Sequence, residues 1–275
     1  NLISKKLEKN KIKIIPFRNL LLNKNYYPDF NKSYSFSLPK SHIPRQYKKN
    51  LSWVTKSIKA EGLLIWNNAH IAYLLNIRSF ELENSTKPFA GLFIFKNNKK
   101  PIIISNDNCL KEIIKIQNNF LIISNDEFVS HLSKQKIKSI ELDYKYNNLF
   151  NYLSLEKICK IQNSKIDLDK FISKKTTVEF NNIGLAHIED GLSLTRFILK
   201  IKQNMKLFSD EYSFIDELYN LRKEGINFFR NSFDYISALD ENGAIVHYKP
   251  TLKSSKKFNK QNILLLDSGA HYLEG

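Results

Sequence analysis

The sequence predicts an α/β domain over residues 39–173, followed by the first part of an α+β domain over residues 174–275. In the first region, short apolar segments that suit strands alternate with segments whose apolar residues recur every three or four positions. In the second region, two long helical segments come first and several short strand-like segments follow. Since regular alternation is typical of a sheet covered by helices, we expect a mixed sheet flanked by helices in the first region.

Residues 1–38 are predicted to be the tail of a preceding domain. A short strand is expected at residues 11–15 and one turn of helix at residues 20–22, and prolines then mark an extended connector. The chain begins at Asn1 with neither an initiator methionine nor a signal peptide, so we expect it to be a fragment.

The predicted α/β domain contains strands and helices in regular alternation. Residues 91–95 and 101–104 are expected to pair, because the polar turn 96–99 between them suits a hairpin. The predicted strands are residues 62–66, 91–95, 101–104, 120–123, 139–142 and 165–168. The predicted helices are one that begins near residue 46 and those at residues 68–76, 108–116, 127–134 and 146–161.

The second predicted domain opens with two helices. An apolar stripe runs along residues 177–202, and residues 210–224 form a second helix with Ser209 as its N-cap. Three strands are expected to follow, at residues 232–238, 244–248 and 262–267. The pair Asn242-Gly243 is typical of a tight hairpin turn.

The net charge of +16 comes mainly from lysine, because arginine supplies only six of the 43 basic residues. Lys, Asn and Ile share AT-rich codons, and the lysines are spread along the chain without an interleaved aromatic stripe. A genomic codon bias therefore explains the charge better than nucleic-acid binding does. No run of about 18 apolar residues is present, so no membrane-spanning segment is expected.

The two cysteines, Cys109 and Cys159, both lie in apolar, helix-like patterns. Buried free thiols are typical of a reducing cytoplasm, so we expect a cytoplasmic protein. Neither cysteine belongs to a CxxC or Cys/His spacing, which argues against a zinc site.

Two polar residues in the predicted strands could carry chemistry. His247 is expected on the same strand face as Ile245, and Asp267 ends the last predicted strand just before Ser268 and Gly269. Taken alone, His247 is more simply a half-buried strand histidine, and Asp267 a turn aspartate. The functional alternative for Asp267 is a carboxylate held by a rigid strand, with room for a metal ion or water. Structural or surface roles are predicted for His187 and His271, and Asp190 is predicted to be a residue of the helix surface.

Several segments, considered together, favour the functional interpretation of these residues. In chain order they are residues 174–191 (KKTTVEFNNIGLAHIEDG), 232–238 (SFDYISA), 242–248 (NGAIVHY) and 265–275 (LLDSGAHYLEG). They resemble the catalytic domain of the Xaa-Pro aminopeptidases (aminopeptidase P), which are creatinase/prolidase "pita-bread" metallopeptidases. Upstream, residues 72–78 (AYLLNIR) are similar to the middle region of the long, three-domain forms, whereas residues 78–88 depart from the usual Gly-Ser-Asp…Asn-Pro pattern.

The resemblance implies a creatinase N-terminal-like α/β domain at residues 39–173 and the first half of an α+β pita-bread catalytic domain at residues 174–275. Such enzymes bind two divalent metal ions, Mn²⁺ or alternatively Zn²⁺ or Co²⁺, through two Asp, one His and two Glu. Asp267 matches the first Asp, and the other four ligands are expected beyond Gly275. His247 matches a histidine that binds substrate beside the metals.

The implied activity is removal of the N-terminal residue from peptides with proline in second position. A cytoplasmic homodimer is expected for the full-length enzyme, and the 275-residue chain alone is expected to be inactive. Neither nucleic acid nor membrane is an expected partner. One alternative is a related enzyme, either a prolidase acting on dipeptides or a creatinase, and another is a non-enzymatic peptide-binding protein. The α/β domain and the Asn-Ile-Arg segment favour the aminopeptidase, and the presence of Asp267 and His247 argues against a non-enzymatic role.

Overall fold

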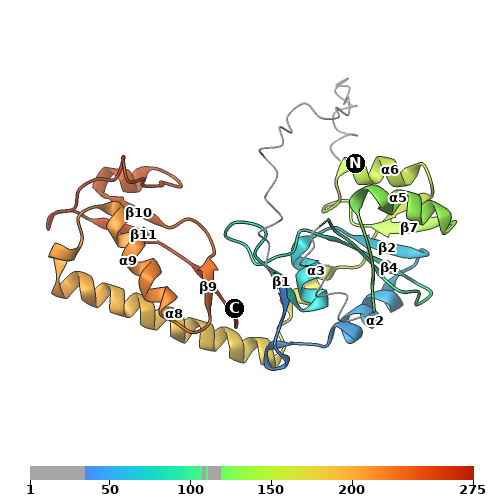
Figure 1. The fold of residues 1–275 in the computed structure, drawn as a ribbon, viewed down its shortest axis with the longest axis horizontal. Helices are drawn as coiled ribbons and strands as arrows, with labels where there is room; N and C mark the ends of the chain where they lie inside the picture. Colours follow the sequence, from blue (N-terminus) through green and yellow to red (C-terminus); the bar gives the residue numbers. More distant parts are fainter. Residues whose placement is uncertain (1–34, 107–109, 111–118) are drawn as a thin grey trace, which may run out of the picture. The chain divides into compact units, whose positions relative to one another are not determined.

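The computed structural model describes residues 35–106, 110 and 119–275, which form two compact units (Figure 1). The first unit contains the described residues up to Ser37, together with Arg45–Leu82 and Lys87–Ile172. The second unit contains Leu38–Pro44, Glu83–Thr86 and Ser173–Gly275. The segments 38–44 and 83–86 thus group with the second unit, although they lie almost entirely within the range predicted for the α/β domain. The predicted elements at residues 11–15, 20–22 and 108–116, and Cys109, lie outside the described residues apart from Leu110.

A six-stranded mixed sheet forms the centre of the first unit, with the strand order β6-β5-β4-β2-β7-β8. The central strand β2 pairs antiparallel with β4 and parallel with β7. The strands are β2 (Gly62–Ile65), β4 (Gly91–Phe95), β5 (Ile102–Ile104), β6 (Leu121–Ile123), β7 (Ser139–Leu142) and β8 (Lys160–Asn163). The antiparallel pairing of β4 with β5 confirms the predicted hairpin.

Helices cover both faces of this sheet, as the alternation of side chains along β2 shows. Leu63 and Ile65 pack with helices α2 and α3, whereas Leu64 packs on the other face with α5 and α6. The helices are α2 (Tyr47–Ser57), α3 (Asn68–Leu75), α5 (Asn125–Lys134), α6 (Leu149–Glu156) and α7 (Leu168–Ser173). A small antiparallel pair, β1 (Ser35–Ser37) with β3 (Ile77–Ser79), completes the unit. The predicted mixed sheet flanked by helices is confirmed.

The last strand of the sheet differs from its prediction. The predicted helix 146–161 ends at Glu156, and the edge strand lies at Lys160–Asn163 instead of 165–168. Ile161 is the single apolar residue of this four-residue strand, so the sequence contains no apolar pattern that would reveal it. Cys159 consequently lies in the connection between α6 and β8, half-buried and unpaired by any disulfide.

The second unit opens with two helices, as predicted, and continues with four short strands in two antiparallel pairs. Thr176 and Glu179 form a reciprocal capping box at the start of α8. Asp210, rather than Ser209, caps α9 by accepting the backbone N–H of Ser213. The elements are η3 (Lys40–His42), α8 (Thr177–Gln203), η4 (Met205–Leu207), α9 (Glu211–Lys223), β9 (Phe228–Asn231), β10 (Ile236–Leu239), η5 (Asp240–Ala244), β11 (Leu264–Asp267) and β12 (Ala270–Tyr272).

The core of the second unit lies between the two helices and the β10–β11 pair. Phe197 of α8, Phe214 and Leu218 of α9 and Leu239 of β10 are all at most 1% exposed. None of the helices among the described residues has the length and apolar character that crossing a membrane requires.

Candidate active site

The antiparallel pair β10–β11 places Asp267 on the face that points away from the helices. Side chains alternate along β11, so Leu264 and Leu266 pack against the core while Leu265 and Asp267 face the opposite way. Asp267 is exposed, and its side chain makes no hydrogen bond or ion pair with any described residue. Its carboxylate is therefore held by a paired strand and is free to bind a ligand.

His247 lies in a turn, so the predicted strand at residues 244–248 is wrong. The Ile245 carbonyl accepts the N–H of Tyr248 at 3.2 Å, and His247 is the third residue of the four-residue turn that this bond closes. Its φ is +55°, the left-handed region that a turn of this kind can require at its third position. The imidazole is exposed.

The predicted tight hairpin at Asn242-Gly243 is also wrong, because these residues belong to the short helix η5. Strand β10 pairs with β11 across the long connection from Asp240 to Ile263. Asp240 closes this connection: its N–H donates to the Ile263 carbonyl at 3.0 Å, and its carboxylate accepts the Ile263 N–H at 2.8 Å. The side chain of Asp240 therefore joins the ends of the two strands, where the pair Asn242-Gly243 alone would favour a tight turn.

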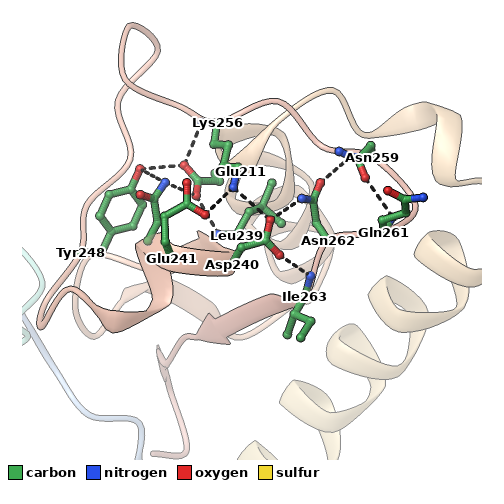
Figure 2. A network of polar contacts seen from close by, with 11 residues as sticks. Glu211, Leu239, Asp240, Glu241, Tyr248, Lys256, Asn259, Gln261, Asn262 and Ile263 are labelled. Atoms are coloured by element: carbon green, nitrogen blue, oxygen red, sulfur yellow. Dashed lines mark hydrogen bonds and ion pairs between the residues drawn. The ribbon is translucent and has the colours of Figure 1, made fainter.

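A buried carboxylate, Glu211 in the first turn of α9, binds several parts of this connection (Figure 2). One oxygen, Oε1, accepts the Leu239 N–H at 2.7 Å and the Asn242 amide at 2.8 Å. The other, Oε2, accepts the Tyr248 hydroxyl at 2.7 Å and the Lys256 N–H at 2.9 Å. Burial by itself would raise the pKa of Glu211, but these donors outweigh burial and lower it.

A second ion pair holds the chain just beyond His247. The ammonium of Lys249 pairs with the carboxylate of Asp234, which also accepts the Asn84 amide at 3.0 Å. These donors, Lys249 above all, lower the pKa of Asp234. The two residues that follow His247 are thus both held by acidic side chains, Tyr248 by Glu211 and Lys249 by Asp234.

Of the three residues predicted to be structural or at the surface, Asp190 has the most contacts. Its carboxylate binds Arg222 of α9 through two hydrogen bonds and accepts the hydroxyl of Tyr272 at 2.9 Å. Asp190 is therefore structural rather than a simple surface residue. His187 is exposed, as predicted, and His271 lies within 3.3 Å of the Asn84 carbonyl.

The described residues hold no complete metal site. No group of three or more His, Cys, Asp or Glu side chains that could hold a metal ion occurs in the part of the chain that the structure describes. His247 lies within the connection from Asp240 to Ile263, whereas Asp267 ends the strand that follows it, and no hydrogen bond joins the two residues. Asp267, an exposed carboxylate with no described partner, fits as one ligand, but one carboxylate does not fix a divalent ion.

Comparison with known proteins finds a family match within the second unit. Residues 183–275 match metallopeptidase family M24. The M24 segment begins within α8 and contains both His247 and Asp267.

Individual relatives extend the similarity upstream of the M24 segment. Xaa-Pro aminopeptidase 1 of Dictyostelium discoideum is 28% identical over 261 residues, which cover 90% of this chain and 41% of the relative. A protein named "Probable Xaa-Pro aminopeptidase P" of Podospora anserina is 38% identical over 104 residues, or 37% of this chain and 15% of the relative. The chain thus spans about two fifths of the length of the first of these relatives.

Solved structures share the fold described above. An X-prolyl aminopeptidase from Caenorhabditis elegans, described as a cytosolic enzyme with a di-nuclear active site, superposes with a TM-score of 0.81 at 18% identity. That comparison covers 98% of this chain and 46% of the other. An Xaa-Pro dipeptidase from Bacillus anthracis has a TM-score of 0.61 at 15% identity, covering 83% and 62% of the two chains. At these identities the similarity establishes the fold, which agrees with the predicted fold class.

Proposed function

We propose that the full-length protein is a metal-dependent aminopeptidase that removes the N-terminal residue from peptides with proline in second position. The proposal is carried by Asp267, an exposed and unpaired carboxylate at the end of a paired strand within the M24 segment. The relatives that extend over most of this chain are named Xaa-Pro aminopeptidases, which supports the same activity.

Asp267 would be the first of five ligands to two divalent metal ions, with Mn²⁺ the favoured metal and Zn²⁺ or Co²⁺ the alternatives. When bound, two such ions supply a hydroxide nucleophile at neutral pH and polarise the peptide carbonyl. We place the other four ligands beyond Gly275. No group of three or more potential metal-binding side chains occurs among the described residues, which is consistent with this, because a hard divalent ion needs several oxygen or nitrogen ligands.

His247 would be the catalytic histidine. An exposed imidazole has both a donor and an acceptor nitrogen, so it can hydrogen-bond the substrate or the oxyanion that develops at the scissile carbonyl.

Three further assignments belong to the same proposal. The first unit would be the creatinase N-terminal-like domain and the second the start of the catalytic domain, preceded by a 1–38 tail from another domain. The protein would be cytoplasmic, in keeping with the nematode enzyme that is described as cytosolic. It would also form a homodimer, which a measurement of mass in solution tests directly.

The decisive experiment compares full-length wild type with Asp267→Asn. We expect calorimetric titration with Mn²⁺ to show two sites in the wild type and weakened binding in the variant, with loss of Xaa-Pro hydrolysis. Asp216→Asn is the matched control, because Asp216 is an exposed carboxylate on α9 of the same unit. Unchanged metal binding and turnover in Asp267→Asn would refute the assignment.

Peptide length separates the two candidate activities. The aminopeptidase should cleave tripeptides and longer peptides with proline in second position, whereas a prolidase, the alternative, should cleave only the dipeptide. Binding of such peptides without cleavage by the metal-loaded full-length protein would favour the non-enzymatic alternative.

A further inference from the structure

We infer that Glu211 is a positioning residue that sets the conformation of the connection carrying His247. The inference rests on the proposed function for the role of His247, but the anchoring itself is a property of this chain. Glu211 lies on α9, far from His247 in sequence, and does not contact it directly.

The hydrogen bonds to Glu211 come from the last residue of β10 and from three residues of the connection, Asn242, Tyr248 and Lys256. Leu239 is the last residue of β10, Tyr248 directly follows His247, and Lys256 lies on the returning segment. Figure 2 shows the Glu211 carboxylate among these residues. One buried carboxylate therefore fixes three points of a single long connection, which a chain of flexible residues would otherwise leave free.

Apolar packing does little to hold the part of the connection around His247. Ile245 is 54% exposed, Val246 82% and Leu252 81%. Since the hydrophobic residues around the turn bury little surface, the conformation of the turn depends on its hydrogen bonds. Tyr248 supplies the bond closest to His247, and its burial beside Glu211 raises the pKa of its hydroxyl to about 12, so it is a donor at neutral pH.

Substitution of Glu211 by glutamine changes the hydrogen bonds while nearly preserving size. All four groups around Glu211 donate hydrogen, and glutamine has an amide donor where one carboxylate oxygen accepted. If the amide nitrogen of the glutamine takes the place of Oε2, the Tyr248 hydroxyl can rotate and accept a hydrogen bond from it. The Lys256 N–H cannot do so and is left without an acceptor. Glu211→Gln should therefore loosen the returning segment, and Tyr248→Phe should remove only the bond beside His247.

The test combines amide exchange with steady-state kinetics in the full-length protein. For Glu211→Gln we expect the amides of Leu239, Tyr248 and Lys256 to exchange at least roughly tenfold faster, with the core amides of α9 little changed. We expect kcat for an Xaa-Pro peptide to fall about 10- to 100-fold, with a smaller change in KM, since misplacing a catalytic group mainly affects turnover. Tyr248→Phe should show the same pattern, reduced in size, and Asp216→Asn should match wild type.

A double-mutant cycle with His247→Asn shows whether Glu211 acts through His247. If it does, Glu211→Gln lowers kcat in the wild-type background but adds little once the imidazole is absent. An equal drop in both backgrounds, or unchanged exchange at all three amides, would overturn the inference. Absence of any Xaa-Pro hydrolysis in the wild type would refute the proposed function instead. The exchange experiment would then still test whether Glu211 holds the connection in place.

Discussion

The carboxylate of Asp190 on α8 binds the guanidinium of Arg222 on α9 through two hydrogen bonds, of 2.8 and 3.1 Å. Arg222 is only 1% exposed, and its guanidinium also lies over the ring of Tyr235, 5.0 Å from the ring centroid. Tyr272 donates its hydroxyl to the same carboxylate, and this hydrogen bond and burial both raise its pKa, burial more strongly. Asp190 therefore neutralises a buried cation and connects both helices to strand β12.

Replacing Asp190 with asparagine should destabilise the second unit selectively. The buried Arg222 would lose its counter-charge, and hydrogen bonds to charged groups contribute about 1.5–3 kcal/mol each. We expect a loss near the lower end of this range, because the Asp190 side chain is 30% exposed. Amide exchange in α8 and α9 measures the loss.

Tryptophan fluorescence provides an internal control for that experiment. Both tryptophans, Trp53 and Trp66, lie in the first unit, so their unfolding transition should not move in Asp190→Asn. Asp216→Asn should change stability by no more than about 0.5 kcal/mol. A variant as stable as wild type in α8 and α9 would contradict the role assigned to Asp190.

In the first unit, acid should weaken the contacts of helix α7 with its surroundings. Asp169 of α7 accepts hydrogen bonds from the Tyr146 hydroxyl and Lys145 and lies 2.8 Å from His70, and these contacts, Tyr146 above all, lower its pKa. A lowered folded-state pKa means that this stabilisation is complete above the ordinary value of 3.8 and is lost as pH falls below it.

The Trp53 ring reports this change, because it stacks on Phe171 of α7 at 4.1 Å. We expect wild-type fluorescence to change as pH falls below about 4 and the change to be smaller in Asp169→Asn, which no longer titrates there. Since the Asp169 side chain is 52% exposed, the effect should be modest. Asp126→Asn, which alters an exposed carboxylate of α5, should retain the wild-type profile; identical profiles for all three proteins would contradict the prediction.

The thiol of Cys159 should react slowly with alkylating reagents. Burial, and to a lesser degree the charge of Glu61, raises its pKa to about 11. At pH 8 the thiolate, which is the reactive form, should be about 100-fold scarcer than for a thiol of ordinary pKa. Peptide mapping after iodoacetamide treatment measures the rate at this site, with the urea-unfolded chain as reference. Equal rates in folded and unfolded protein would contradict the prediction.

Replacing His247 should reduce turnover without unfolding the protein. Asparagine is the better replacement, because it tolerates the left-handed conformation that His247 adopts, whereas alanine at positive φ adds strain. In the full-length protein we expect His247→Asn to lower kcat for an Xaa-Pro peptide on the order of 100-fold, with an unchanged melting curve. Normal kinetics in a folded variant would show that His247 has a purely structural role.

The parts of the fold that follow from local pattern were predictable. The long helix α8 and the succession of short apolar strands and helices in the first unit depend on residues close in sequence, and the structure confirms both. The position of Asp267 at the end of a strand followed in the same way from the apolar residues before it and the Ser-Gly after it.

Contacts between distant residues were not predictable from such patterns. The alternation in residues 244–248 is typical of a strand, but Asp240 and Glu211 bind the backbone around it and stabilise a short helix and a turn. Arg222 looks like an ordinary basic residue near a helix end, and only its spatial neighbour Asp190 makes it a buried partner. A single sequence contains no direct record of such pairs.

The mutual bonds between Asp240 and Ile263 also bear on how this region can change by insertion and deletion. They fix the register of β10 against β11 where the connection leaves and rejoins the strands. The number of residues between Asp240 and Ile263 therefore does not determine how the strands align. Lengthening a flexible loop is thermodynamically mild, since doubling its length costs only about 0.6 kcal/mol. Residues around Leu252, which are exposed, should therefore accept insertions that leave both strands and Asp267 where they are.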